Sequence, residues 1–186
     1  MSSFPSPAIG HVRRTLGLFA FAALIAAAPA QAMEPIGEIN GEIGGDSFAW
    51  ETLDVPSEGT ATAEFEAFGP VTTISIQGHE QGGESRMRNV ISLDLSLMGE
   101  GDAGSIMDAD ISFFPDGLSG PFYISTDAPR EAEISFDTLT LSDDAGMAEG
   151  SFTALLCRQD SFMTPPDLED CIEANGRFST RLRPRA

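Results

Sequence analysis

Apolar and polar residues alternate along much of this chain, most regularly near its C-terminal end. Residues 171–183 place apolar, small or threonine side chains at every second position and polar, charged or cysteine side chains between them. Residues 151–157 also alternate, with Phe152, Ala154 and Leu156 on one face and Thr153, Leu155 and Cys157 on the other. A period of two over these lengths predicts two β-strands joined by a loop. Cys157 and Cys171 both fall outside the apolar phase, where a bridge between neighbouring strands is geometrically feasible.

Alternation also predicts strands earlier in the chain, separated by turns rich in Gly, Pro, Asn and Asp. The predicted segments are two short strands within 36–53, a hairpin of 60–68 and 71–77, and single strands at 89–98, 107–113, 122–126 and 132–141. In the last of these the apolar phase changes between Phe136 and Leu139. This change predicts a bulge near Asp137 or a strand that crosses between two sheets. Helical signal is nearly absent, because only 167–174 could form a turn of helix, in competition with the final strand.

The number and spacing of these segments predict the fold class. Roughly nine to ten short strands, punctuated by Gly and Pro, are typical of an all-β antiparallel β-sandwich or open barrel. Neither a repeat nor a linker divides residues 33–186, so we expect a single all-β domain. Trp50, the single tryptophan, shares a strand face with Phe48 and is expected to anchor its core.

Residues 1–32 have the pattern of a signal peptide. A positive leader ends at Arg13-Arg14, an apolar run spans 16–28, and Ala30-Gln31-Ala32 forms a small-x-small cleavage site. The run is shorter than the about 20 residues of a spanning helix, and no cysteine at the cleavage site could accept a lipid, so we expect no stable membrane anchor after cleavage. The chain is therefore expected in the periplasm or outside the cell. The paired arginines leave the ordinary secretory route and the twin-arginine route open.

Cys157 and Cys171 are the two cysteines of the chain. In an exported protein two cysteines most simply form one disulfide. A redox-active pair is the alternative, but the spacing is far from Cys-x-x-Cys. We therefore predict a structural bridge between them.

The chain is strongly acidic, with a formal net charge of −19, and all ten of its basic residues are arginine. Because phosphate binding needs a basic surface, nucleic acid is excluded as a partner for the body of the domain. Such a surface is either simply solvated or attractive to cations. Acids that lie close in sequence are the candidates for calcium: Asp108, Asp110 and Asp116; Glu100 and Asp102; Asp143 and Asp144. None has the spacing of an EF-hand loop, so we assign no metal site and no cofactor.

Four arginines gather in the last ten residues: Arg177, Arg181, Arg183 and Arg185. In one interpretation Arg177, Arg181 and Arg183 pair with acids on a neighbouring strand. The segment that carries Glu131, Glu133 and Asp137 is an example of such a neighbouring strand. In the other, the basic segment docks on an acidic protein partner or on a second copy of the chain.

Residue types suited to catalysis are scarce after the leader. His79 is the one histidine there, and its sequence context predicts a surface loop over 79–88. Gly45-Asp46-Ser47-Phe48 resembles the nucleophile block of the GDSL-type esterases, but the helices and the C-terminal histidine of that family are missing. We expect a turn there and assign no catalytic residue. Among 29 acids, no carboxylate pair stands out.

Together these features favour an exported, acidic binding or structural module without a catalytic centre. One alternative is a binding domain that depends on calcium or another cation, using the acidic loops. A second alternative is an exported hydrolase with a carboxylate mechanism, which requires two acids facing each other in a cleft.

Overall fold

The computed structural model describes residues 33–83, 85–99 and 104–185, and these form an all-β fold. The predicted signal peptide, residues 1–32, lies outside the described residues, as do Glu100 and Asp102. The strands are β1 (Glu34–Ile43), β2 (Asp46–Val55), β3 (Thr60–Ala61), β4 (Ala63–Phe68), β5 (Val71–Glu80), β6 (Val90–Met98), β7 (Ser105–Phe114), β8 (Phe122–Ile124), β9 (Glu133–Leu141), β10 (Gly146–Gln159) and β11 (Asp167–Pro184). Each predicted strand corresponds to one or two of these.

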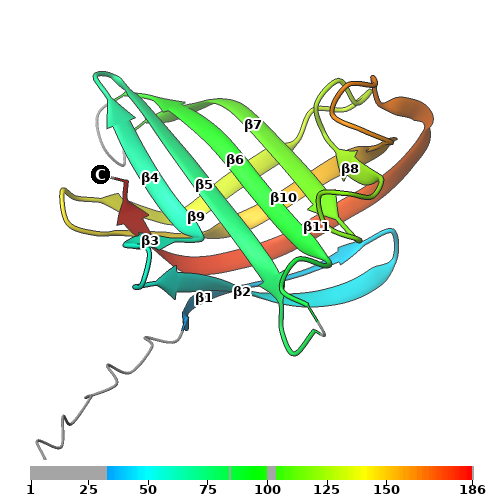
Figure 1. Cartoon of the computed structure of the whole chain (residues 1–186). Helices are drawn as coiled ribbons and strands as arrows, with labels where there is room; N and C mark the ends of the chain where they lie inside the picture. Colours follow the sequence, from blue (N-terminus) through cyan, green and yellow to red (C-terminus); the bar gives the residue numbers. More distant parts are fainter. Residues whose placement is uncertain (1–32, 84, 100–103, 186) are drawn as a thin grey trace, which may run out of the picture.

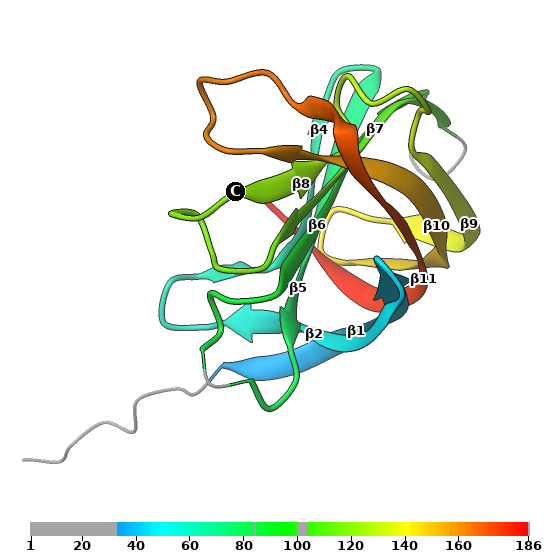
Figure 2. The same ribbon diagram turned by 90° about the vertical axis from the view of Figure 1, so that its right-hand side faces the viewer.

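All eleven strands belong to one mixed sheet, in the order β3-β2-β1-β11-β4-β5-β6-β7-β8-β10-β9. Additional pairings join β2 to β5 and β10 to β11, so that hydrogen-bonded neighbours run in a ring from β11 through β4 to β8 and back through β10. Figure 1 shows β4 to β7 crossing in front of β9, β10 and β11. In both Figure 1 and Figure 2, β1 and β2 lie below β4 to β7. The predicted sandwich or open barrel is therefore confirmed in outline. One short pairing, β11 with β4, is parallel.

The core fills the space between the two layers. Alternation places the even-numbered apolar residues of β5 and the odd-numbered ones of β6 on this side, and their side chains are buried. Trp50 is completely buried and stacks on Phe48, with ring centroids 5.1 Å apart. Its Nε1 donates a hydrogen bond to the main-chain oxygen of Asn89 at 2.6 Å. The expectation that Trp50 anchors the core is confirmed.

The predicted bulge near Asp137 is also confirmed. Phe136 lies opposite Gly150, and Thr138 lies opposite Glu149, so Asp137 is the extra residue on β9. An extra residue reverses the side-chain parity of a strand. This reversal explains why the apolar phase changes between Phe136 and Leu139.

A disulfide joins Cys157 of β10 to Cys171 of β11, as the sequence predicts. The two cysteines lie directly opposite each other in the antiparallel register. Immediately beyond them the register shifts, because Arg158 pairs with Asp167. The bridge therefore holds the two longest strands together where their regular pairing ends. It is consistent with an oxidising location for the chain.

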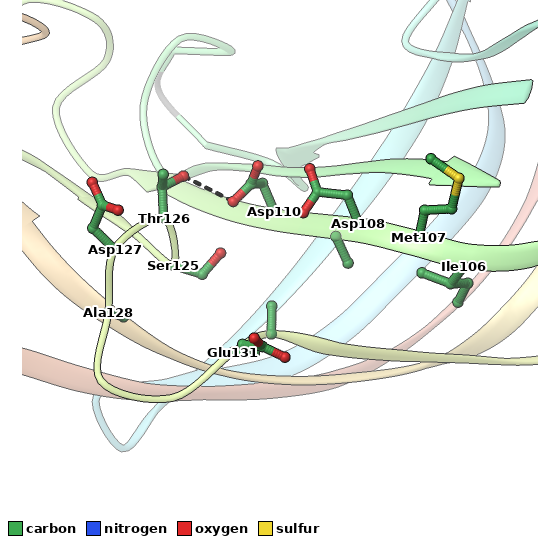
Figure 3. A pocket seen from close by; sticks show the side chains of 11 residues that line it. Ile106, Met107, Asp108, Asp110, Ser125, Thr126, Asp127, Ala128 and Glu131 are labelled. Atoms are coloured by element: carbon green, nitrogen blue, oxygen red, sulfur yellow. Dashed lines mark hydrogen bonds between the residues drawn. The ribbon is translucent and has the colours of Figure 1, made fainter. Parts of the chain in front are cut away.

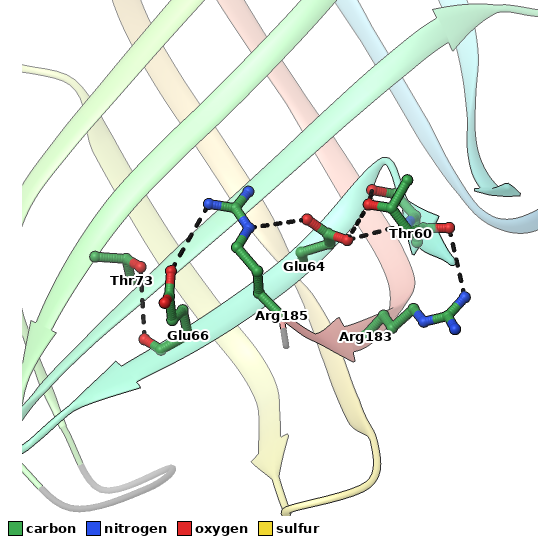
Figure 4. A network of polar contacts seen from close by, with 7 residues as sticks. Thr60, Glu64, Glu66, Thr73, Arg183 and Arg185 are labelled. Atoms are coloured by element: carbon green, nitrogen blue, oxygen red, sulfur yellow. Dashed lines mark hydrogen bonds and ion pairs between the residues drawn. The ribbon is translucent and has the colours of Figure 1, made fainter. Parts of the chain in front are cut away.

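The short parallel pairing of β11 with β4 completes the ring of strands. Glu64 is the central side chain at this pairing (Figure 4). Its buried carboxylate accepts hydrogen bonds from the Thr60 hydroxyl, from the main-chain nitrogen of Ala61 at 3.0 Å and from Arg185 Nε at 3.1 Å. Burial raises the pKa of the Glu64 carboxyl, but the hydrogen bonds from Thr60, Ala61 and Arg185 outweigh it and hold the pKa below its ordinary value of 4.5. The ionised form of Glu64 therefore stabilises the closure.

Replacing Glu64 by Gln is expected to lower the free energy of unfolding at neutral pH by about 1–2 kcal/mol, because a charge-assisted acceptor is lost. Because the pKa of Glu64 is lower in the folded protein than in the unfolded chain, ionised Glu64 stabilises the fold fully at pH values above the unfolded-state pKa. This stabilisation is lost as the pH falls through the folded-state pKa. The difference between wild type and variant should thus shrink as the pH is lowered through and below 4.5. Urea unfolding, followed by Trp50 fluorescence over this pH range, measures it. The same change at Glu58, an exposed acid in the turn after β2, should have little effect at any pH.

Candidate functional site

A cleft of about 570 Å³ opens beside the first half of β7 (Figure 3). Its other wall is the segment that leads from β8 into β9. The volume lies within the range of small-ligand sites, which is roughly 300–1,000 Å³. The lining residues are Ile106, Met107, Asp108, Ala109, Asp110, Ser125, Thr126, Asp127, Ala128, Glu131 and Ala132.

Ser125 fastens the second wall of the cleft to β7. Its main-chain nitrogen donates to the oxygen of Ile111 at 2.9 Å, and its buried hydroxyl accepts from the nitrogen of Ile111 at 2.8 Å. The next residue, Thr126, donates from its hydroxyl to Asp110 Oδ1 at 2.8 Å. Asp127 then takes a left-handed conformation with a φ of 60°, which Asp tolerates better than most residues. These contacts hold both walls in a defined position.

Four carboxylates line the cleft: Asp108, Asp110, Asp127 and Glu131. Asp108 and Asp110 are two positions apart on β7 and therefore share one face of the strand. Figure 3 shows Asp127 beyond Thr126 and Glu131 across the cleft from β7. No basic side chain is among the lining residues, and within the described ranges no arginine forms an ion pair with any of the four.

The negative charge continues onto β6. Asp94 lies directly opposite Asp110 in the antiparallel register. Like charges in this position destabilise a sheet, and natural proteins tend to keep such conflicts where function requires them. Hydroxyl groups moderate this one, since Ser92 Oγ donates to Asp94 at 2.7 Å. The site can accept charge-assisted hydrogen bonds from ammonium or guanidinium groups.

The structure brings together only part of the predicted calcium candidates. Asp108 and Asp110 lie side by side, whereas Asp116 lies beyond the other end of β7 and pairs with Arg88 at 2.6 Å. Asp143 and Asp144 are exposed in the turn between β9 and β10. In the part of the chain that the structure describes, no group of three or more His, Cys, Asp or Glu residues could hold a metal ion.

Sequence reasoning did not connect Asp127 and Glu131 with this site. They follow β8, and only the pairing of β8 with the second half of β7 places them in the lining of the same cleft as Asp108. The one local signal was the pair of acids at alternate positions of β7. That signal indicates an exposed strand face but not what lies across from it.

The prediction that His79 lies in a surface loop is wrong. β5 continues to Glu80, because its end pairs with β2, where His79 lies opposite Glu51. The His79 side chain is buried, with the residue 8% exposed, and its Nδ1 donates to the main-chain oxygen of Arg86 at 2.6 Å. His79 therefore helps to hold the segment between β5 and β6. Ser47, from the esterase-like block, lies in β2, and the turn before it is formed by Gly44 and Gly45.

The C-terminal arginines contact acids of neighbouring strands. Arg177 pairs with Asp137 at 2.5 Å, as the first interpretation predicts. Arg183 pairs with Asp54 of β2 at 2.8 Å rather than with the predicted strand, and Arg185 contacts Glu64. For Arg181 the described residues provide no ion pair. Internal pairing thus accounts for most of this basic segment.

Of the residues with a described structure, none belongs to a helix long and apolar enough to cross a membrane. Comparisons of the chain with protein-family models, with curated proteins and with solved structures found no match.

Proposed function

We propose that this protein is an exported binding module without a catalytic centre, and that it takes a cationic ligand in the cleft beside β7. The observation that carries the proposal is a cleft of ligand size whose described lining contains four carboxylates and no basic side chain; Arg185 lies near Asp108 and Asp110 only in the adjoining hollow over β5 and β6. The signal-peptide pattern and the disulfide support the periplasm or the extracellular space as the location.

Charge alone does not distinguish this cleft from the rest of an acidic surface. The distinguishing feature is its shape, because acids from β7 and from the segment after β8 line one cavity. A ligand with several ammonium or guanidinium groups could contact both walls at once. Hydrogen bonds between ionised partners are roughly twice as strong as neutral ones, so removing two carboxylates from one wall should have a measurable effect.

The test is calorimetric titration of the purified protein with spermine, a linear polyamine. We expect saturable binding that weakens as the salt concentration rises. Replacing both Asp108 and Asp110 by Asn should weaken spermine binding about tenfold or more, because both carboxylates that β7 contributes to the cleft are lost. Asn has nearly the same shape as Asp, and these side chains are not buried, so the fold should be preserved.

The chain provides a matched control. Asp143 and Asp144 are also two neighbouring exposed acids, and their replacement by Asn removes the same formal charge at the turn between β9 and β10. This control variant should bind spermine nearly as well as wild type. An equal loss of affinity in both double variants would mean that spermine responds to net charge only, and the proposed site would be abandoned.

A further inference from the structure

In the described part of the chain, one edge of β7 has no partner strand along its first half. β7 pairs with β6 from Ser105 to Phe114, but it pairs with β8 only at Ser112 and Phe113, followed by the Ser125 contacts to Ile111. Among the described residues, no strand lies against 105–110 on the side away from β6. The side chains of residues 105–108 are all exposed. This half of β7, which also lines the cleft, therefore has unpaired backbone groups along one edge.

β8 joins β7 to β10 only through residues 112–113 of β7 and 157–159 of β10, so the ring is open beside the first half of β7. β9, at the end of the strand order, pairs with β10 alone, and the cleft lies between β7 and the residues that lead into β9. The free edge of β9 is interrupted by the bulge at Asp137, and bulges discourage further strand pairing. β7 also has an extra residue, Met107, inside its free half, but its register with β6 is regular from Asp108 onward, where Asp108 and Asp110 line the cleft. The β7 edge beside the cleft is thus the better place for an added strand.

The side chains on this edge indicate what kind of strand would fit. Asp108 and Asp110 lie on one face, where a paired strand would place its alternate side chains about 5 Å away. Ile106 and Met107 are apolar yet 37% and 55% exposed. A strand with basic residues at alternate positions and apolar residues between them would pair its charges with Asp108 and Asp110. Its apolar side chains could then cover Ile106 and Met107.

We propose that the ligand of the cleft is an extended, basic segment of another protein, which pairs through its backbone with the free edge of β7. The proposal rests on the proposed function and names its ligand class. In this mode of recognition, main-chain hydrogen bonds supply affinity, and alternate side chains supply specificity. A second copy of the chain is not the occupant, because its arginine-rich strand β11 is already inside the sheet, and Arg177, Arg183 and the following Arg185 are ion-paired.

The probe is a short peptide in which arginine alternates with valine, with both ends blocked. Two isomers of it carry backbone N-methyl groups, one on all arginine amides and the other on all valine amides. Successive amides of a strand point to opposite edges, so each isomer blocks pairing at one edge only. All three peptides have the same charge. We expect the unmodified peptide to bind and at least one isomer to bind about tenfold or more weakly.

A second measurement is amide hydrogen exchange of the β7 edge. The unmodified peptide should slow exchange within residues 105–110, whereas spermine, which has no peptide backbone, should not. Equal affinity of the three peptides, or no protection of these amides, would overturn strand addition. Weaker spermine binding by the Asp108 and Asp110 variant would still support the cationic site in that case. If neither spermine nor peptide depends on Asp108 and Asp110, both proposals fail.

Discussion

Replacing Trp50 by Ala is expected to lower the free energy of unfolding by about 3–5 kcal/mol, the range for removing a large aromatic side chain from a core. Trp50 is completely buried and stacks on Phe48, whose ring in turn lies 5.4 Å from that of Phe113 on β7. These three rings connect β2 to the opposite layer. The alanine variant would leave a cavity at this connection and also lose the hydrogen bond to Asn89. Urea unfolding followed by far-ultraviolet circular dichroism measures the change, because the variant has no tryptophan fluorescence.

Trp50→Phe separates packing from hydrogen bonding. Phenylalanine keeps an aromatic ring against Phe48 but has no N–H to donate to the main-chain oxygen of Asn89. It should therefore lose only about 1–2 kcal/mol. If the alanine and phenylalanine variants were equally stable, the hydrogen bond rather than the buried ring would be the main contribution, contrary to our expectation.

Replacing Cys157 by Ser is expected to lower the free energy of unfolding by about 3 kcal/mol in oxidising buffer, through the loss of a crosslink that closes a short loop in the unfolded chain. The cysteines are 14 residues apart. Under reductant the wild type should no longer have the higher free energy of unfolding, since the bond is then absent from both proteins. Chemical unfolding with and without reductant measures both values.

Cys171→Ser is the matched control for this bridge. Both variants lose the same bond, but Cys157 is fully buried and Cys171 is only half-buried. A serine at position 157 must also bury its hydroxyl, so Cys157→Ser should be the less stable of the two. Equal melting of wild type and Cys171→Ser in oxidising buffer would show that the bridge does not stabilise the fold.

The two proposals assign stability to one side of the sheet and ligand binding to the other. Pairing at β11 and β4, with Glu64 and Arg185, closes one side of the sheet, and the disulfide holds β10 to β11. The side between β7 and β9 stays open and contains the acidic cleft. Binding there would need no rearrangement of the closed side. We therefore expect a pre-formed site, which reduces the entropic cost of binding.

The sequence by itself determined which segments become strands, because side-chain alternation is a local property of each segment. From a change of phase within ten residues it predicted a bulge near Asp137 or a strand that crosses between sheets, and from the parity of Cys157 and Cys171 and the expected export it predicted their bridge. These predictions needed no knowledge of which strands are neighbours.

Only the tertiary structure decided which strands pair and therefore which side chains meet. The pairing of β5 with β2 buries His79, although its glycine-rich surroundings predict a loop. The short pairing of β7 with β8 brings Asp127 and Glu131 into the lining of the same cleft as Asp108, and among the described residues it leaves the neighbouring edge of β7 without a partner strand. Contacts of this kind depend on the register between segments distant in the chain. Spacing along the sequence does not encode that register, because many registers satisfy the same alternation.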